Sequence, residues 1–411
     1  MTALLTLDIE SIAAGGDGVA RHDGLVVFVP RTAPGDRVQA RVQSQGRFAR
    51  GALVAIERGG AGRVAPECAH YDGDACGGCQ LQHLALDAQR TAKSLLVRDA
   101  FARIGRRTVE PPPVLGAGAP WRYRRKLTLA LRRTGDAWHA GLHRLNAPDE
   151  VFALDDCLIT DQRIVSAFHD VMVQGAHLLP RVNALRASMR RDGDDLLLVV
   201  EGAERWPQAR AFAESVTAVS AVWWVDAAGR RQLLHDRRAS ATAGASFVQV
   251  NAEVAEQLAA HVVARIRAQA PSTVVDAYAG TGDVAVTLAT SGVSVSAIEY
   301  DADASAECAA KLAAPSRAIA GRVEDVLAGL LPADVVLLNP PRAGVAREVT
   351  DCLAACTPRP RAIVYVSCDP ATLARDVARL PDWRVSSLVC FDMFPQTAHV
   401  ETVCELVPEA A

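Results

Sequence analysis

Residues 273–299 read TVVDAYAGTGDVAVTLATSGVSVSAIE, and this stretch decides the fold of the C-terminal part of the chain. An apolar run leads into a loop with Gly280 and Gly282, a helical stretch follows, and a second apolar run ends at Glu299. Glycines between a strand and a helix let the backbone turn tightly and approach a ligand. An acid at the end of the next strand suits the two hydroxyls of a ribose. For the loop alone, a plain strand-to-helix turn is the alternative.

Strand and helix alternate in this way from about residue 237 onward. The pattern predicts helices over 250–269, 282–290 and 304–314, and strands over 273–280, 293–301, 334–341 and 362–370. Such alternation favours an α/β fold with a parallel, doubly wound sheet.

The part before residue 237 has a different pattern. Residues 1–58 contain short apolar or alternating runs separated by glycines, which favours a small OB-like β-barrel. Six arginines lie between residues 31 and 58, against two acids, so this part suits RNA phosphates, with a solvated arginine face as the alternative. Residues 59–236 mix strands with helical stretches over 85–105 and near 161–175, which indicates a central α+β domain.

Bulk properties narrow the class of protein. The net charge of -3 does not by itself indicate a nucleic-acid-binding protein. No long uncharged apolar run is present, and the N-terminal MTALLTLDIES lacks the basic start of a signal peptide. We therefore expect a cytoplasmic protein with no membrane partner, and we expect a monomer.

A cysteine lies at the end of another apolar run. Cys368 stands in VYVSCDPATLARD, and Pro370 breaks the chain just beyond it. Ligands bind at the carboxyl edge of such sheets, so Cys368 is a candidate nucleophile. Near the C-terminus, Glu401 follows a histidine in FDMFPQTAHVETVCEL; taken alone, it would be interpreted as a salt-bridged surface residue.

The motifs SCDPATLARD and FDMFPQTAHVETVCEL closely resemble the two signatures of the iron–sulfur-containing RNA uracil-5-methyltransferases, and the resemblance extends over almost the whole chain. It implies a Rossmann-like S-adenosyl-L-methionine (SAM) methyltransferase domain over 237–411, an RNA-binding TRAM barrel over 1–58 and a central domain over 59–236. It also implies that Cys368 adds to uracil C6, which makes C5 nucleophilic toward the SAM methyl group, and that Glu401 removes the C5 proton.

The same resemblance implies the residues that contact SAM: Gln249, Tyr278, Asp283, Glu299 and Asn339. Without it, Gln249 would be an unremarkable polar residue, Tyr278 could simply pack, and Asp283 could cap a helix. Asn339 departs from the family, which usually has Asp in this D-P-P-R motif. Asn still forms hydrogen bonds, but it cannot fill a role that needs a negative charge. Because N-P-P-aromatic motifs also occur in methyltransferases that act on amino groups, that chemistry is the second hypothesis.

Three cysteines lie close together, in CAHYDGDACGGC, and a fourth follows in LDDCLIT: Cys68, Cys76, Cys79 and Cys157. Such a set can hold zinc or an iron–sulfur cluster, or it can remain free thiols. Structural zinc usually takes two close pairs, and here one pair is missing. The resemblance implies a [4Fe-4S] cluster on these four cysteines, tying the N-terminal loop to the central domain.

The expected partner is RNA, with ribosomal RNA ahead of tRNA. The strip Trp121–Lys126, WRYRRK, interleaves aromatic and basic residues in a way that suits phosphate contact and base stacking. Its alternative is an edge strand with solvated charges. A third hypothesis for the chain is a non-catalytic RNA-binding protein that keeps the barrel and the cluster.

Overall fold

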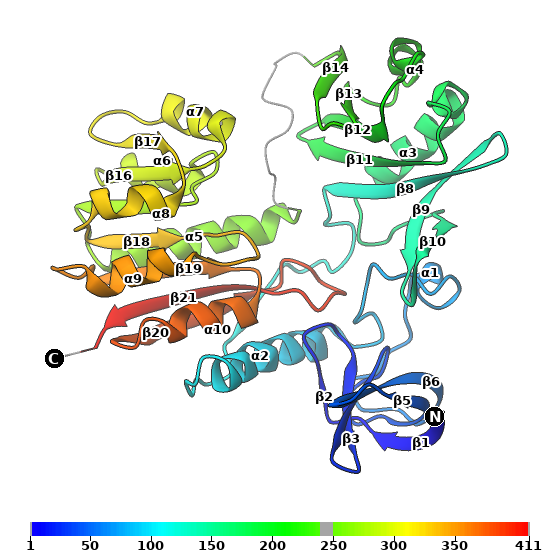
Figure 1. The fold of residues 1–411 in the computed structure, drawn as a ribbon, viewed down its shortest axis with the longest axis horizontal. Helices are drawn as coiled ribbons and strands as arrows, with labels where there is room; N and C mark the ends of the chain where they lie inside the picture. The colour runs from blue at the N-terminus through cyan, green and yellow to red at the C-terminus, as the bar shows by residue number, and fades with distance from the viewer. Residues whose placement is uncertain (1, 239–249, 410–411) are drawn as a thin grey trace. The chain divides into compact units, whose positions relative to one another are not determined.

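The structure is a computed structural model that describes residues 2–238 and 250–409 (Figure 1). The chain divides into two compact units. The first comprises Met1–Leu86, Gly118–Ala252 and Pro395–Ala398, and the second Asp87–Ala117, Glu253–Phe394 and His399–Ala411. This division does not separate the barrel from the central sheet, so the domain boundary expected at residue 58 stays a prediction. No helix in the described ranges has the length and apolar character needed to cross a membrane.

The N-terminal strands form one six-stranded sheet in the order β1-β5-β6-β4-β3-β2. Neighbouring strands pair antiparallel, except for the parallel pair β4 and β6. Alternate residues, such as Val27, Val29 and Val38, point inward and are buried in a small core of their own. The strands are β1 (Thr2–Asp8), β2 (Ser11–Ile12), β3 (Gly18–His22), β4 (Leu25–Val29), β5 (Arg37–Ser44) and β6 (Phe48–Arg58).

The first unit also contains a seven-stranded sheet in the order β10-β9-β8-β11-β12-β13-β14. Its strands are β8 (Lys126–Thr134), β9 (Ala137–Arg144), β10 (Ala147–Ala153), β11 (Ala184–Asp192), β12 (Asp195–Ala203), β13 (Ala221–Asp226) and β14 (Arg231–Asp236). The accompanying helices are α1 (Ala69–Asp72), α3 (Gln162–Gly175), the short 3-10 helix η1 (Ala176–Leu178) and α4 (Ala209–Ser215). The predicted helix near 161–175 is confirmed as α3: Asp161 caps it by accepting from the Arg163 N–H, and its apolar stripe packs on the sheet through Phe168.

The second unit is built on an eight-stranded sheet in the order β17-β16-β15-β18-β19-β21-β20-β7. Its strands are β7 (Val114–Leu115), β15 (Thr273–Ala277), β16 (Ser294–Glu299), β17 (Arg317–Ala320), β18 (Val335–Leu338), β19 (Ala362–Ser367), β20 (Trp383–Phe391) and β21 (Glu401–Pro408). Its helices are α2 (Leu86–Arg103), α5 (Ala252–Ala268), α6 (Asp283–Ala289), α7 (Ala302–Lys311), α8 (Val323–Val326), η2 (Leu327–Leu330), α9 (Arg347–Ala355) and α10 (Pro370–Ala378). The strands from β17 to β19 are parallel, as predicted, while β21 runs antiparallel to β19.

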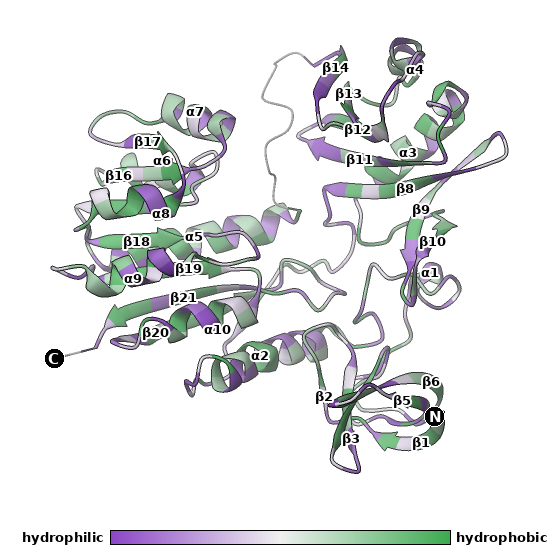
Figure 2. Ribbon diagram, viewed as in Figure 1, coloured by the Kyte–Doolittle hydropathy of each residue, from purple (hydrophilic) through white to green (hydrophobic). Residues whose placement is uncertain are grey.

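The central parallel strands carry apolar side chains on both faces. All residues of β18 and β19 are buried, and β18 is coloured as hydrophobic in Figure 2. Helices on both faces of a parallel sheet account for this pattern. The strand order runs from β15 through β16 to β17 on one side and from β15 to β18 and β19 on the other, so β15 marks the switch point where such folds bind ligands.

A buried ion pair holds α2 within the second unit. Nζ of Lys93 lies 2.5 Å from Oδ1 of Asp392, and both side chains are fully buried. Lys93 also donates to the carbonyl oxygen of Phe394 at 2.9 Å. Because Asp392 follows β20 directly, the pair ties α2 to the chain that leaves this strand.

Candidate functional site

The glycine loop follows β15 and is held by a carboxylate at the end of β16. The Gly280 N–H donates to Oε2 of Glu299 at 2.8 Å, and the Asp301 N–H donates to Oε1 of the same side chain at 2.8 Å. The Glu299 side chain is partly exposed. Strand β16, whose end carries Glu299, is thus fastened to the loop at the switch point.

Glycine is required at position 282 on two grounds. Its φ of +83° lies in the left-handed region, and a Cβ there would lie 2.3 Å from Sγ of the buried Cys308. Below the loop, Asp276 is almost completely buried, and burial raises its pKa to about 7, assisted by the nearby Glu299. No role for Asp276 was expected from its position in the sequence.

The other residues expected to contact SAM lie around the same edge. Tyr278 begins the loop with φ +65° and is half-buried, and Asp283 is exposed at the first turn of α6. Asn339 directly follows β18, is exposed, and its N–H donates to the carbonyl of Ala277 at 3.2 Å. The loop and Asn339 are therefore neighbours. Gln249, the remaining member of the set, lies outside the described residues.

Cys368 and Glu401 come together through strand pairing. Cys368 directly follows β19, and Glu401 is the first residue of β21. Ser367 pairs with Thr402 in the antiparallel register, so the next residue on each strand brings Cys368 opposite Glu401. Because β15, β18 and β19 are parallel, this pair lies at the same carboxyl edge as the glycine loop.

The two side chains have perturbed acidity. Burial raises the pKa of the Cys368 thiol, the adjacent Glu401 raises it further, and the charge of Arg342 lowers it. Burial raises the pKa of Glu401 from 4.5 to about 7, again opposed by Arg342. A carboxyl group that titrates near neutral pH can accept a proton during a reaction, which is the property of a general base.

Arg342, which was not expected from the sequence to act, lies in a turn clamped to the helix that follows Cys368. The carbonyl of Arg342 accepts from Oγ1 of Thr372 at 3.2 Å, and the carbonyl of Ala343 accepts from Nη2 of Arg375 at 2.8 Å. The Val345 N–H donates to Oδ2 of the buried Asp376 at 3.0 Å. The motif after β18 is thus fixed to α10 along its length.

The four cysteines expected to bind metal line one cavity of about 160 Å³ in the first unit. Cys76 and Cys79 are buried, and Cys68 and Cys157 are partly so; none forms a disulfide. Burial raises the pKa of Cys76 to about 11 and of Cys79 to about 12, and the neighbouring thiols add to this effect. The structure therefore brings together the set that the sequence singled out.

His70 connects the cysteine loop to the chain before Cys157, and Arg122 holds that chain from the basic strip. Nδ1 of His70 lies 2.8 Å from Oδ2 of Asp74, and Nε2 of His70 accepts from the Asp155 N–H at 3.2 Å. Arg122 binds both carboxylate oxygens of Asp156, at 2.8 and 2.7 Å, and donates to the carbonyl of Cys157 at 3.0 Å. Part of the basic strip 121–126 is therefore engaged in holding the cysteine cavity.

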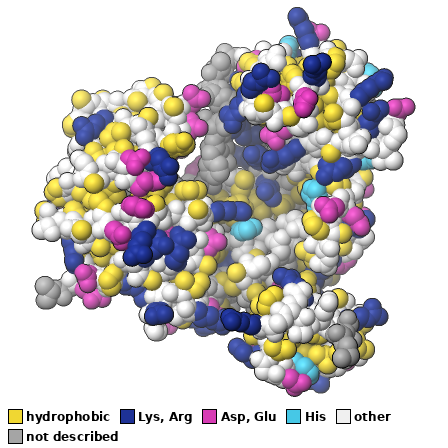
Figure 3. Space-filling model, viewed as in Figure 1, with side chains coloured by type: hydrophobic (Ala, Val, Ile, Leu, Met, Phe, Trp, Pro, Cys, Tyr) yellow, Lys and Arg dark blue, Asp and Glu magenta, His cyan; other side chains and the backbone are white. Residues whose placement is uncertain are grey.

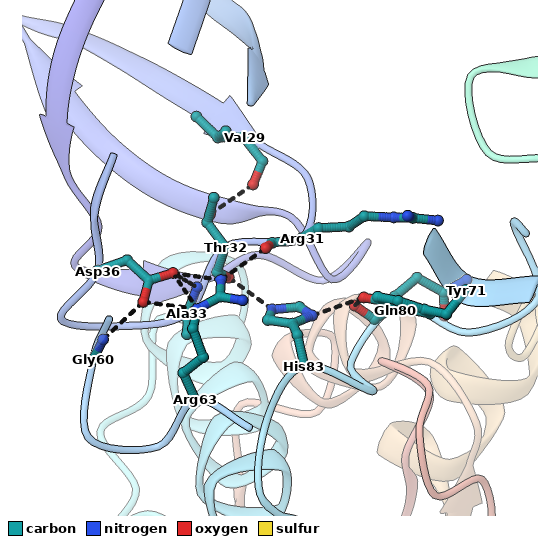
Figure 4. A network of polar contacts seen from close by, with 10 residues as sticks. All are labelled: Val29, Arg31, Thr32, Ala33, Asp36, Gly60, Arg63, Tyr71, Gln80 and His83. Atoms are coloured by element: carbon teal, nitrogen blue, oxygen red, sulfur yellow. Dashed lines mark hydrogen bonds and ion pairs between the residues drawn. The ribbon is translucent and has the colours of Figure 1, made fainter. Parts of the chain in front are cut away.

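Figure 4 shows how the barrel is attached to the cysteine loop. Nε2 of His83 lies 3.0 Å from the carbonyl of Thr32, at the end of the barrel, and Nδ1 lies 2.8 Å from the hydroxyl of Tyr71. Burial lowers the pKa of His83 to about 4, so the ring is neutral near pH 7. Nearby, Arg63 binds the buried Asp36, which also accepts from backbone N–H groups, and these bonds hold the pKa of Asp36 below its usual value despite burial.

The metal site itself is not shown by the structure. Within residues 2–238 and 250–409, no group of three or more His, Cys, Asp or Glu side chains is arranged to hold a metal ion. Cys68, Cys76, Cys79 and Cys157 share one cavity in the first unit.

Comparison with known proteins gives matches over the whole chain. An RNA methyltransferase of Thermosynechococcus vestitus, itself uncharacterized, is 32% identical, with 98% of each chain covered. The 23S rRNA (uracil(1939)-C(5))-methyltransferase RlmD of Shewanella sp. strain MR-4 is 28% identical, covering 98% of this chain and 95% of that one. The solved structure of the Pyrococcus abyssi tRNA (uracil-54, C5)-methyltransferase with S-adenosyl-L-homocysteine matches with a TM-score of 0.71 at 21% identity, covering 98% and 99% of the two chains.

Two family descriptions also match. Residues 302–407 match the tRNA (Uracil-5-)-methyltransferase family, and residues 4–54 match the TRAM domain. The predicted α/β methyltransferase fold with an N-terminal TRAM domain is thereby confirmed. The chain belongs to the family of RNA uracil-5-methyltransferases.

Proposed function

We propose that this enzyme methylates C5 of a uridine in RNA through a covalent bond between Cys368 and uracil C6, with SAM as the methyl donor. One observation carries the proposal: the pairing of β19 with β21 brings a thiol and a carboxyl group of near-neutral pKa to the edge of the sheet that holds the glycine loop. An enzyme that methylates an amino group, which is the second hypothesis, does not need a thiol paired with a carboxyl group.

The two side chains perform complementary steps. Uracil C5 is a weak nucleophile, and addition of the Cys368 sulfur to C6 moves the electron pair of the C5–C6 double bond toward C5 and O4. After C5 has gained the methyl group, Glu401 takes the C5 proton. The electron pair left by that proton re-forms the C5–C6 bond, and the bond between Cys368 and C6 breaks. The raised pKa of Glu401 suits a group that must accept a proton near pH 7.

The glycine loop and its neighbours fit the proposed cofactor. SAM supplies an electrophilic methyl group when it is bound. Space is open above Gly280, since a Cβ there would meet nothing within 4 Å. The partly exposed carboxylate of Glu299 lies beside this loop and can accept hydrogen bonds from ribose hydroxyls. We assign Tyr278, Asp283 and Asn339 to the same site; Asn339 would contribute hydrogen bonds without a charge. The role expected of Gln249, which lies outside the described residues, stays a prediction.

We propose 23S ribosomal RNA as the substrate, with tRNA as the alternative. The support is the match to relatives named as 23S rRNA methyltransferases, which covers 98% of this chain and 95% of theirs. The tRNA alternative is supported by the match of residues 302–407 to the tRNA (Uracil-5-)-methyltransferase family. Lys and Arg side chains gather near β11 on the face shown in Figure 3, where Lys126 of β8 is close to Arg186 and Arg190. Such a group suits RNA phosphates. Mapping of 5-methyluridine by mass spectrometry in rRNA and tRNA, with and without the gene, distinguishes the two substrates.

We further propose that the cysteine cavity holds a [4Fe-4S] cluster bound by Cys68, Cys76, Cys79 and Cys157. Four thiols around one buried cavity match the ligand set of such a cluster. Structural zinc usually takes two close pairs of cysteines, and here only Cys76 and Cys79 form such a pair. Its role would be to join the cysteine loop to the chain around Cys157. Protein purified without oxygen should contain iron and sulfide, and Cys79→Ser should lower both; zinc, or neither element, would contradict this proposal.

The covalent step has a direct test. RNA containing 5-fluorouridine should form a stable adduct with the enzyme, because fluorine cannot leave C5 as a proton does. The adduct should be absent in Cys368→Ala, which should also transfer no methyl group, whereas Glu401→Gln should accumulate an adduct with ordinary RNA. Full methylation by Cys368→Ala would overturn the proposed mechanism and would favour the amino-group chemistry.

A further inference from the structure

A buried hydroxyl lies beside the sulfur of Cys157, the one cysteine of the proposed cluster site that is distant in the sequence from the other three. Oγ1 of Thr160 donates to Sγ of Cys157 at 3.2 Å. Thr160 is fully buried, yet it is not among the residues that line the cavity of the four cysteines. Its hydroxyl therefore reaches the sulfur from outside the cavity, and the uridine methylation proposed above does not use it.

The backbone of Thr160 is held on both sides. Its N–H donates to the carbonyl of Cys157 at 2.8 Å, and its carbonyl accepts from Nη1 of Arg122 at 3.3 Å. The N–H of the next residue, Asp161, donates to the carbonyl of Arg124 at 3.0 Å. Because the turn is fixed in this way, the hydroxyl loses little conformational entropy when it binds the sulfur.

The other polar groups around the cavity suit an anionic occupant. A second sulfur, that of Cys76, accepts from the Gly78 N–H at 3.4 Å. Arg124 lines the cavity, and its Nε is buried without a hydrogen-bond partner among the residues that the structure describes. A buried donor without an acceptor is costly, and thiolate ligands would place negative charge beside it. The residues present therefore fit a [4Fe-4S] cluster bound by four thiolates.

We propose that Thr160 is a positioning residue for the fourth ligand of the cluster, and that its O–H···S bond orients Sγ of Cys157 and stabilises the reduced cluster. This inference rests on the [4Fe-4S] cluster proposed above. Uptake of one electron, supplied by dithionite in a titration, adds negative charge to the ligand sulfurs without forming or breaking a bond. A hydrogen bond donated to such a sulfur favours the reduced form and therefore raises the reduction potential.

The test compares Thr160→Val with Thr160→Ser in the full-length protein, purified without oxygen. Valine has the shape of threonine without the hydroxyl, and serine keeps the hydroxyl. Redox titration with dithionite, followed by EPR spectroscopy of the reduced cluster, measures the midpoint potential. Thr160→Val should lower this potential, and Thr160→Ser should stay close to the wild type. Thr160→Ala carries the same expectation as Thr160→Val if the valine disturbs packing.

Thr128→Val is the matched control. Thr128 lies in β8 on the wall of the same cavity, and its hydroxyl forms no hydrogen bond within the described part of the chain. This variant therefore makes the same substitution at the same cavity without removing a donor to a sulfur. Its midpoint potential should match the wild type. A shift as large as that of Thr160→Val would assign the effect to packing and overturn the inference.

Loss of the cluster in air supplies the second measurement, followed by visible absorbance and by released iron. Thr160→Val should release iron about tenfold faster than the wild type or more, because the fourth ligand has lost the group that orients it. Equal potentials and equal rates of iron release in both proteins would overturn the inference and leave the cluster standing. A wild-type protein that contains zinc, or neither iron nor sulfide, would remove the proposed cluster and this inference together.

Discussion

Replacing Glu401 by Gln should stabilise the folded second unit while it abolishes turnover. Burial raises the pKa of this carboxyl group from 4.5 to about 7, and each pKa unit corresponds to about 1.4 kcal/mol. Below pH 4.5 the Glu401 side chain is neutral in both the folded and the unfolded chain, so it does not reduce the free energy of unfolding. Between pH 4.5 and about 7 the carboxyl group ionises in the unfolded chain but not in the folded chain, so stability falls over this range and levels off above pH 7. The full cost is about 3 kcal/mol, and because Glu401 is buried, solvent screening does not reduce it much.

A glutamine cannot ionise, so Glu401→Gln should be more stable than the wild type by about 3 kcal/mol at pH 8 and by about 1 kcal/mol at pH 5. Hydrogen–deuterium exchange of the β18 and β19 peptides, corrected for the intrinsic pH dependence of exchange, reports the free energy of opening. Glu348→Gln, an exposed change on α9, controls for removal of a carboxylate from the same unit. A variant less stable than the wild type at both pH values would mean that Glu401 is ionised and stabilised by partners, and would refute the reasoning.

Three further predictions concern the framework of the second unit. Lys93→Met should destabilise it by about 3 kcal/mol, seen in urea unfolding, because the charge of Asp392 remains buried; changing Asp392 to Leu as well should recover most of the loss. Gly282→Ala should weaken SAM binding in calorimetry by about tenfold or more, since a Cβ would collide with Cys308 in a backbone conformation that disfavours alanine. Glu299→Ala should raise the KM for SAM by about tenfold or more with a smaller effect on the KM for RNA, and equal effects on both would contradict its role.

Local sequence patterns account for much of the methyltransferase fold. The predicted strand and helix around the glycine loop are confirmed as β15 and α6, and the strand that ends at Glu299 is confirmed as β16. These elements have strong local signals in the sequence: apolar runs of strand length, glycines, and a change in the spacing of apolar residues from that of a strand to that of a helix. The helix predicted over 85–105 is also confirmed, as α2. Most of it belongs to the second compact unit, whereas the sequence pattern groups it with the central domain.

The arrangement of the candidate site could not be obtained in this way. Cys368 and Glu401 were expected to act together from a family resemblance, but what places them side by side is the antiparallel pairing of β19 and β21. Neither the register of that pair nor the addition of β7 beside β20 leaves a local pattern, because partners distant in the sequence decide them. Arg342 was missed for a similar reason: an arginine in a turn becomes notable only when the buried groups near it are known.

The carboxylate of Glu299 has a consequence for how the chain can change over time. Each of its oxygens already accepts one backbone N–H before any ligand arrives, and each retains a lone pair for a further donor. One side chain therefore shapes the loop and, under the proposed function, would also bind the ribose of the cofactor. An aspartate is shorter by one methylene group and would not reach these N–H groups or the ribose. A glutamine would keep only one of the two accepting oxygens. If Glu299 binds the cofactor as proposed, a single substitution at this position would weaken cofactor binding and disturb the loop together.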